Sequence, residues 1–123
     1  MNETLNNLKT RRSIRSYLPK QVEKDLLEQV LEAGTFAPTG GGRQTPVIVA
    51  VQDEATVKQL SRMNAAVNGN KSDPYYGAPT VLVVLADRSR GTYQLDGASV
   101  MTTLLNAAYA VGLGSCWIHR AKE

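Results

Sequence analysis

Apolar side chains recur at helical spacing along several stretches of the chain. In residues 22–34 they form a stripe on one face, with acidic residues near its start and a glycine at its end, a pattern typical of an amphipathic helix. Weaker stripes predict a short helix over residues 2–10 and another over 53–67. A longer helix is expected over 94–111, where many small residues favour close packing against another helix or a second subunit.

Continuous apolar runs at residues 47–51 and 80–86 have the length of β-strands. They lack the alternation of a half-exposed strand, which predicts strands that are covered on both faces. A shorter apolar run at 115–119 predicts a last strand. The order of elements therefore mixes helices and strands within one chain, and the length of 123 residues suits a single domain.

A run of three glycines at positions 40–42 joins the second predicted helix to the first predicted strand. Glycine accepts positive φ and lets backbone N–H groups come close to a ligand, so the loop is a candidate binding element. It is not a phosphate-binding P-loop, because no lysine followed by serine or threonine comes after the last glycine. A flexible helix-to-strand connection remains the alternative, since glycine clusters usually mark loops.

Three arginines fall within five residues near the start of the chain. In an extended segment, Arg11, Ser13 and Arg15 lie along one side, and Arg12 points to the other. A row of cation, hydroxyl and cation suits an elongated anionic ligand, because guanidinium groups make forked, charge-assisted bonds to phosphate. On this segment alone, a solvated basic loop is the alternative.

Charge and composition exclude several classes of partner. The net charge is only +3 and the basic residues gather at the start of the chain, which favours a local anion site over a nucleic-acid surface. No apolar run has the length of a membrane span, and no secretory leader is visible. The single cysteine excludes an internal disulfide framework and fits a reducing compartment. We therefore expect a cytoplasmic protein that binds neither nucleic acid nor membrane.

Side chains for acid–base or metal chemistry are few. One histidine and one cysteine are too few for a His/Cys metal site, so no metal is expected, and no nucleophile-elbow motif is present. Cys116 lies in an apolar run and is interpreted as an inert buried thiol. If the protein is an enzyme, a cofactor carries the chemistry, and no catalytic side chain is assigned.

Four segments taken together resemble one family, the FMN-dependent nitroreductases. They occur in the order and with the spacing of that family and span nearly the whole chain: residues 11–15, 37–44, 78–86 and 96–118. The resemblance implies an α+β fold in which helices flank a mixed β-sheet, with FMN bound at the interface of an intertwined homodimer. It also implies a flavoprotein oxidoreductase that moves hydride from NADH or NADPH through FMN to a small electron-poor acceptor, such as a nitro compound or a quinone.

The resemblance further implies which residues contact the cofactor. They are Arg11, Arg12, Ser13, Arg15, Pro38, Thr39, Gly40, Asn64, Ile118 and His119. Arg11 would meet the FMN phosphate, Ser13 the phosphate or ribityl chain, and Arg15 the N1/O2 edge of the ring, where a fixed cation stabilises negative charge. Residues 38–40 would come from the partner subunit, and Asn64 would hydrogen-bond the flavin.

The backbone of residues 118–120 would lie beside flavin N5. His119 is interpreted as contributing backbone and shape there, with a proton-donating side chain as the alternative. Family members continue well beyond Glu123, so we expect one nitroreductase-like domain over residues 1–123 that is C-terminally incomplete relative to the family. The alternative function is therefore a non-catalytic flavin- or nucleotide-binding module, or a truncated remnant with an incomplete site.

Overall fold

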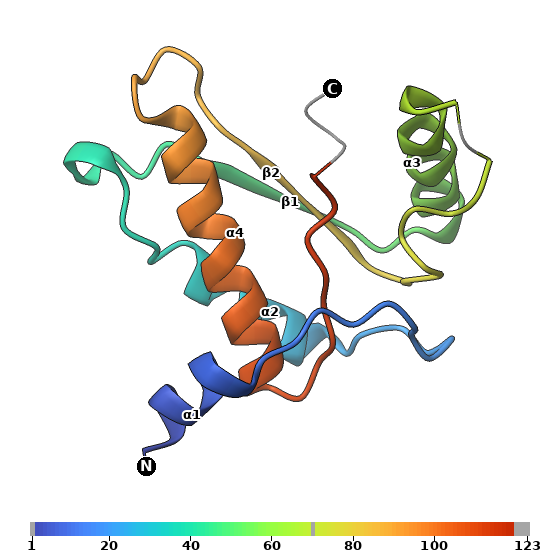
Figure 1. The fold of residues 1–123 in the computed structure, drawn as a ribbon, viewed down its shortest axis with the longest axis horizontal. Helices are drawn as coiled ribbons and strands as arrows, with labels where there is room; N and C mark the ends of the chain where they lie inside the picture. Colours follow the sequence, from blue (N-terminus) through green and yellow to red (C-terminus); the bar gives the residue numbers. More distant parts are fainter. Residues whose placement is uncertain (1, 70, 120–123) are drawn as a thin grey trace.

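The computed structural model describes residues 2–69 and 71–119. Helices outnumber strands in this part of the chain, and the architecture is α+β (Figure 1). In chain order, the elements are α1 (Glu3–Thr10), α2 (Lys24–Gly34), β1 (Val47–Val51), α3 (Glu54–Val67), β2 (Val81–Leu85) and α4 (Tyr93–Ala110). All four predicted helices are confirmed, with ends that shift by one or two residues.

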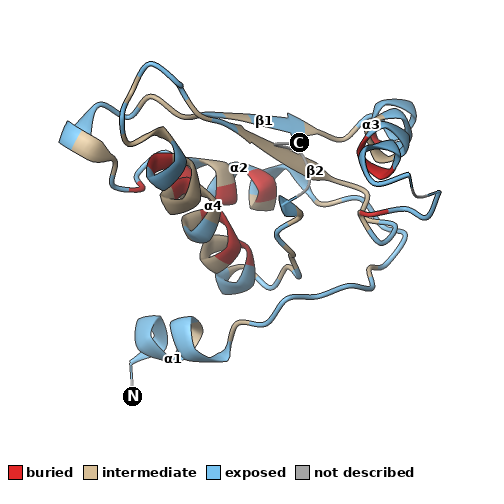
Figure 2. Cartoon of the chain, turned by 45° about the horizontal axis from the view of Figure 1, so that its top comes forward, coloured by how far each residue is buried: buried red, intermediate tan, exposed pale blue. Residues whose placement is uncertain are grey.

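Strands β1 and β2 form a two-stranded antiparallel sheet, with Val47 opposite Leu85 and Val51 opposite Val81. Helices α2 and α4 pack together on one face of it, and α3, which connects the two strands in sequence, lies beyond one end of the sheet (Figures 1 and 2). The core forms between α2, α4 and the covered face of the sheet. Its buried members are Val30, Ala37, Val100, Leu104 and Ala108, and Ile48, Leu82 and Val84 pack against them from the strands.

The prediction that both strands are covered on both faces is wrong for the described part of the chain. The side chains of Val47, Val49 and Leu85 are 55%, 40% and 53% exposed. Successive strand residues point to opposite faces, and α2 and α4 cover only one of them. The unbroken apolar run therefore leaves an apolar open face rather than a second buried one.

The predicted last strand at 115–119 is also wrong as an extended element. Pairing there is limited to one parallel bridge between Ser13 and Ser115, where the Ile14 N–H donates to the Ser115 carbonyl at 3.0 Å. At Gly114, an added Cβ would lie 3.1 Å from the Ile14 side chain, so the two segments approach closely at this point. One bridge does not build a strand, but it fixes the arginine segment beside the end of the described chain.

Close packing between α2 and α4 depends on small residues, as the sequence predicted. Gly34 is buried where α2 ends, and a Cβ there would lie 2.5 Å from Leu104 Cδ2 and 2.9 Å from Ile48 Cδ1. Ala108 is part of the core, and a Cβ at Gly97 would meet Ala86 at 3.5 Å. The absence of larger side chains at these positions lets α4 lie directly against α2 and β2.

Helix α4 also anchors α1. The Asn7 side-chain amide donates to the Asn106 carbonyl at 3.1 Å, and the Tyr109 hydroxyl donates to Thr10 Oγ1 at 3.0 Å. Both contacts lie in the last part of α4. The start of the arginine segment, which follows α1 directly, is therefore held at the C-terminal end of α4.

A polar cluster fixes the end of the connection between α1 and α2 beside the ends of the two strands. The Gln21 side-chain amide donates to the carbonyls of Pro79 and Gln52 at 3.0 and 3.1 Å, and the Gln52 amide donates to the Val22 carbonyl at 3.2 Å. Thr80 Oγ1 completes the cluster by donating to Gln21 Oε1. The segment between α1 and α2 is thus attached at both ends and at one bridge in between.

Asp73 closes the loop that follows α3. Its carboxylate accepts hydrogen bonds from Ser61 Oγ at 2.6 Å and from the N–H groups of Tyr75 and Gly77 at 2.9 and 2.7 Å. Partial burial alone would raise the pKa of Asp73, but these bonds outweigh it and lower the pKa below the ordinary 3.8. The ionised carboxylate is therefore the form that stabilises the fold.

We expect the stability that Asp73 contributes to be present above pH 3.8 and to be lost as the pH falls through its lowered folded pKa. The measurement is urea unfolding of the wild type and Asp73→Asn over a series of pH values. The free-energy difference between the two proteins should be largest at neutral pH and shrink in acid. A difference that stays constant down to acid pH would contradict this assignment.

Candidate functional site

The arginine segment runs as extended chain between α1 and α2 and crosses the segment that follows α4 (Figure 1). Arg11 ends α1 with extended backbone angles, φ −56° and ψ 140°. The bridge at Ser13 then brings the arginines beside residues 113–117. The predicted phosphate-side residues thus lie next to the chain that leads into the predicted N5-side segment, which starts at Ile118.

The guanidinium groups of Arg11 and Arg12 differ in what they bind. Arg12 Nη1 donates to the carbonyls of Lys9 and Arg11 at 3.0 and 2.7 Å, so it caps the end of α1. Arg11 Nη1 is buried and has no acceptor among the residues that the structure describes. A buried donor without a partner costs free energy that an anionic oxygen of a ligand would restore.

Asn64 is the second predicted site residue with an unsatisfied atom. It lies in α3, is 7% exposed, and its Oδ1 has no donor within the described ranges. Buried side-chain amides almost always have partners, so an acceptor left open here suits an N–H group of a bound molecule. No hydrogen bond joins Asn64 to the arginine segment in the described structure.

Tyr17 marks where the arginine segment, the chain after α4 and the loop after α3 converge. Burial is the main cause that raises its pKa, and the nearby Cys116 and Tyr76 add to it while Arg15 opposes it. Cys116 itself is half-buried, which corrects the prediction of a fully buried thiol. The reason is that its segment has only a single bridge and no strand neighbour along its length to cover it.

The residues predicted to lie near flavin N5 end the described chain. Ile118 is half-buried and His119 exposed, and the His119 ring meets the Trp117 ring edge to face with centroids 6.0 Å apart. This contact gives the histidine a packing role on its own chain. Arg120, which was grouped with them, lies outside the described residues.

The glycine loop is held firmly instead of being a flexible connection. Gly40–Gly42 form a short 3-10 turn, with positive φ at Gly41 and Gly42, and the Gly40 N–H donates to Asp96 Oδ1 at 2.8 Å. The Ser99 hydroxyl donates to the Pro38 carbonyl at 2.7 Å. Two side chains of α4 therefore fix the backbone on either side of Thr39.

Gln44 organises the same loop from inside. Its side-chain amide donates to the carbonyls of Thr35 and Ala37, both at 2.9 Å, and its N–H donates to Thr39 Oγ1 at 2.9 Å. The Thr39 hydroxyl in turn donates to Gln44 Oε1. These bonds stabilise Gln44 in a left-handed conformation, φ 51°, that non-glycine residues rarely adopt.

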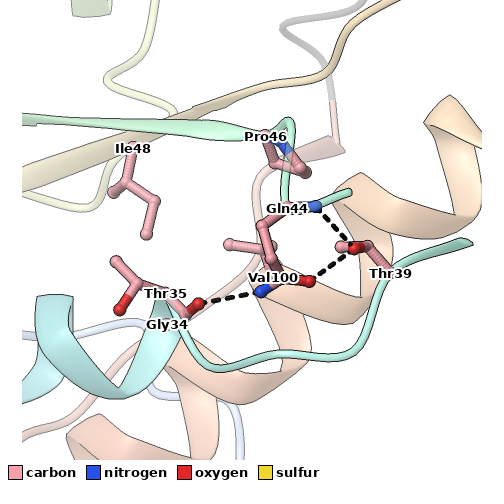
Figure 3. Close-up of a pocket in the computed structure, with 7 residues that line it drawn as sticks. All are labelled: Gly34, Thr35, Thr39, Gln44, Pro46, Ile48 and Val100. Atoms are coloured by element: carbon pink, nitrogen blue, oxygen red, sulfur yellow. Dashed lines mark hydrogen bonds between the residues drawn. The ribbon is translucent and has the colours of Figure 1, made fainter. Parts of the chain in front are cut away.

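A hollow of about 180 Å³ lies behind this loop (Figure 3). Its walls are Gly34, Thr35, Thr39, Gln44, Pro46, Ile48 and Val100. Ligand pockets for drug-sized molecules measure roughly 300–1,000 Å³, so the hollow is too small for a whole flavin nucleotide. Of the predicted site residues, only Thr39 lines it.

The two halves of the predicted site lie at opposite ends of α4. Asp96 holds the glycine loop near the N-terminus of the helix, whereas Asn106 and Tyr109 hold α1 and the arginines near its C-terminus. Ten residues of helix separate Asp96 from Asn106, which is about 15 Å at 1.5 Å per residue. One copy of the chain does not bring the residues of 38–40 to the arginines.

Sequence reasoning missed Asp96 and Gln44 as residues that build this site. Asp96 appeared only as the first residue of a matching segment, and Gln44 only as the last residue of another. A sequence signal for Asp96 is an acidic residue within an otherwise apolar helical stripe. Its buried position, 4% exposed, shows why that signal matters.

Clusters of metal ligands and membrane-spanning helices are both missing from the part of the chain that the structure describes. No cluster of histidine, cysteine and acidic side chains able to hold a metal ion occurs in residues 2–69 and 71–119. In the same ranges, no helix is long and apolar enough to cross a membrane.

Comparison of the sequence with known families and proteins gives consistent matches. Residues 8–123 match the model of the nitroreductase family. A protein of Archaeoglobus fulgidus with the provisional name NADH dehydrogenase/NAD(P)H nitroreductase is 31% identical over 123 residues, covering 96% of this chain and 68% of that protein. The FMN reductase [NAD(P)H] of Bacillus subtilis is 32% identical over 97 residues, covering 78% of this chain and 36% of that protein.

Solved structures match the fold closely. The nitroreductase of Bacteroides fragilis with bound FMN superposes with a TM-score of 0.90 and 31% identity, covering 98% of this chain and 71% of that one. An FMN-dependent nitroreductase of Clostridium difficile gives a TM-score of 0.82 and 32% identity, covering 94% of this chain and 59% of that one. Across these four proteins, the chain spans between 36% and 71% of their length.

Proposed function

The chain belongs to the nitroreductase family, and on that premise we propose that it binds FMN and acts as an NAD(P)H oxidoreductase. When bound, FMN supplies the hydride-accepting and electron-donating chemistry, for which this chain has no side-chain substitute. The protein's own part is to bind and orient the cofactor and to exclude water. The relatives named as an FMN reductase and as FMN-containing nitroreductases support this proposal.

The observation that carries the proposal is the buried, unpartnered Nη1 of Arg11. A phosphate oxygen of FMN would complete the hydrogen bonding of this donor and neutralise its charge. Ser13 and Arg15, both exposed on the same segment, would extend the contact along the ribityl chain toward the ring. Arg12 would contribute by holding the end of α1, because its Nη1 is bonded to backbone carbonyls.

The unpartnered Oδ1 of Asn64 provides a second fit. The flavin ring carries an N–H group, and an amide oxygen that is buried and without a donor is suited to accept from it. The backbone at Ile118 and His119 would complete the ring's surroundings on the N5 side. Arg11 Nη1 and Asn64 Oδ1 are thus buried atoms without a partner, and both belong to residues with a predicted flavin contact.

The complete site requires a second copy of the chain. Residues 38–40 lie about 15 Å along α4 from the contacts that anchor the arginine segment, as counted at 1.5 Å per helical residue. A homodimer in which Pro38, Thr39 and Gly40 of one chain pack along the flavin held by the arginines of the other resolves this separation. The open apolar face of the two-stranded sheet, with Val47 and Val49 exposed, is a surface that further protein could cover.

The acceptor in this proposal is a small electron-poor molecule, such as a nitro compound or a quinone, and NADH or NADPH is the hydride source. The words nitroreductase and NAD(P)H in the names of the relatives support this choice. The compartment in the proposal is the cytoplasm, on the basis of the single cysteine.

A visible absorption spectrum of the purified chain, taken after addition of FMN and desalting, tests the binding step. We expect flavin bands to remain at a ratio near equimolar, and anaerobic NADH or NADPH to bleach them. A chain that stays colourless would overturn the proposal. A chain that keeps FMN but oxidises neither nucleotide with any acceptor would instead be a non-catalytic flavin-binding module.

A further inference from the structure

Asp96 is a buried carboxylate near the start of α4 whose bonds leave its own helix. The residue is 4% exposed. Oδ1 accepts the Gly40 N–H at 2.8 Å, and Oδ2 accepts the Thr92 hydroxyl at 2.9 Å. No lysine or arginine of residues 2–69 and 71–119 forms an ion pair with it. The buried carboxyl group is thus held by two neutral donors.

Two neighbouring side chains, Thr92 just before α4 and Ser99 within it, reinforce the same contact. Thr92 packs so closely on Gly40 that an added Cβ there would collide with its hydroxyl, and Ser99 binds the Pro38 carbonyl at 2.7 Å. Asp96 and Ser99 lie one turn apart on the helix. Together they hold the backbone of residues 38–40 at its two ends, with Thr39 between them.

This use of a carboxylate is costly for stability alone. Removing a charged group from water costs several kcal/mol, and well-packed apolar residues often serve a buried position as well or better. What an apolar side chain does not supply is a fixed acceptor for the N–H of a distant loop. Asp96 therefore specifies the conformation of the loop.

We infer that Asp96 is a positioning residue for the flavin: it presets the backbone of residues 38–40 in the shape that packs along the ring held by the partner chain. This inference rests on the proposed function. Asp96 does not touch the cofactor. Its effect arises because a loop that is ordered before binding loses less conformational entropy when the ligand arrives.

The test compares Asp96→Ala with Asp96→Asn by FMN titration and by amide exchange of Gly40 measured without flavin. In Asp96→Ala, we expect the Gly40 amide to exchange faster and the FMN dissociation constant to rise on the order of tenfold. Asp96→Asn keeps an oxygen facing Gly40, and the Thr92 hydroxyl can rotate to accept, so both readouts should stay near the wild type.

Val30→Ala is the control for a loss of stability, because it removes core packing from α2 and leaves the hydrogen bonds of Asp96 and Ser99 to residues 38–40 in place. Equal weakening of FMN binding by Val30→Ala at a matched melting temperature would overturn the inference, as would an Asp96→Ala variant that binds like the wild type. If Asp96→Ala does not fold, Thr92→Val replaces it, and unchanged FMN affinity in that variant overturns the inference. A wild type that binds no FMN overturns the proposed function, and this inference with it.

Discussion

Replacing Arg11 with alanine is expected to weaken FMN binding by about 10- to 100-fold, whereas Arg12→Ala weakens it by only a few fold. A charge-assisted hydrogen bond contributes about 1.5–3 kcal/mol, which corresponds to this range in the dissociation constant. Arg11 has a buried donor without an acceptor, and the Arg12 donor is already bonded to Lys9 and Arg11 carbonyls. The two substitutions remove the same side chain from neighbouring positions.

Titration of both variants with FMN and with riboflavin measures this difference. Riboflavin has no phosphate, so Arg11→Ala should bind it as well as the wild type does. Thermal melts of the free proteins show whether each variant is folded. Equal losses of FMN affinity in the two variants would contradict the opposite orientation of residues 11 and 12. A matching loss for riboflavin would show that Arg11 acts somewhere other than the phosphate.

Leu104→Ala is expected to lower the free energy of unfolding by about 2–5 kcal/mol. Leu104 is 4% exposed and fills the junction of α2, α4 and β1, where it lies against Gly34. A domain of this size has a total stability of about 5–15 kcal/mol, so this single change removes a large share of it. The loss has two parts. The variant no longer gains the free energy of burying the deleted methyl and methylene groups, and it keeps a cavity that the tight helix packing cannot close.

Urea unfolding with Leu95→Ala as the control measures this loss. Leu95 lies on the same helix but is 72% exposed, so the identical chemical change should stay within about 0.5 kcal/mol. Similar losses at the two positions would contradict the position of the core. A changed slope against urea in Leu104→Ala would show instead that the unfolded ensemble had altered.

Helices α1, α2 and α3 were predictable because each has an apolar stripe of helical period, and this period does not depend on what the helix packs against. Burial of the strands was not predictable. The apolar run at 47–51 has the same sequence whether one face or two are covered, and the positions of α2 and α4 decide which of the two occurs. The prediction of a strand at 115–119 failed for a related reason, because a strand forms only where a neighbouring strand continues beside it.

The candidate site, too, was predictable from the sequence only in part. Alternation along an extended segment separated Arg11 from Arg12, and the structure gives the two side chains different surroundings. The bond from Gly40 to Asp96 joins residues that are 56 positions apart, so no local pattern announces it. The contacts of the site residues with FMN remain predictions that the titrations above test.

Helix α4 holds the glycine loop at one end and the start of the arginine segment at the other. The length of α4 therefore fixes the distance between the loop and the arginines. Inserting or deleting one residue between Ser99 and Asn106 would rotate one end by about 100° and shift it by about 1.5 Å. Residues 87–91 of the polar turn before the helix, unlike Thr92, form no hydrogen bond with either anchor within the described residues. Homologous chains should therefore vary freely in the length of that turn while keeping the number of residues between these two anchors unchanged.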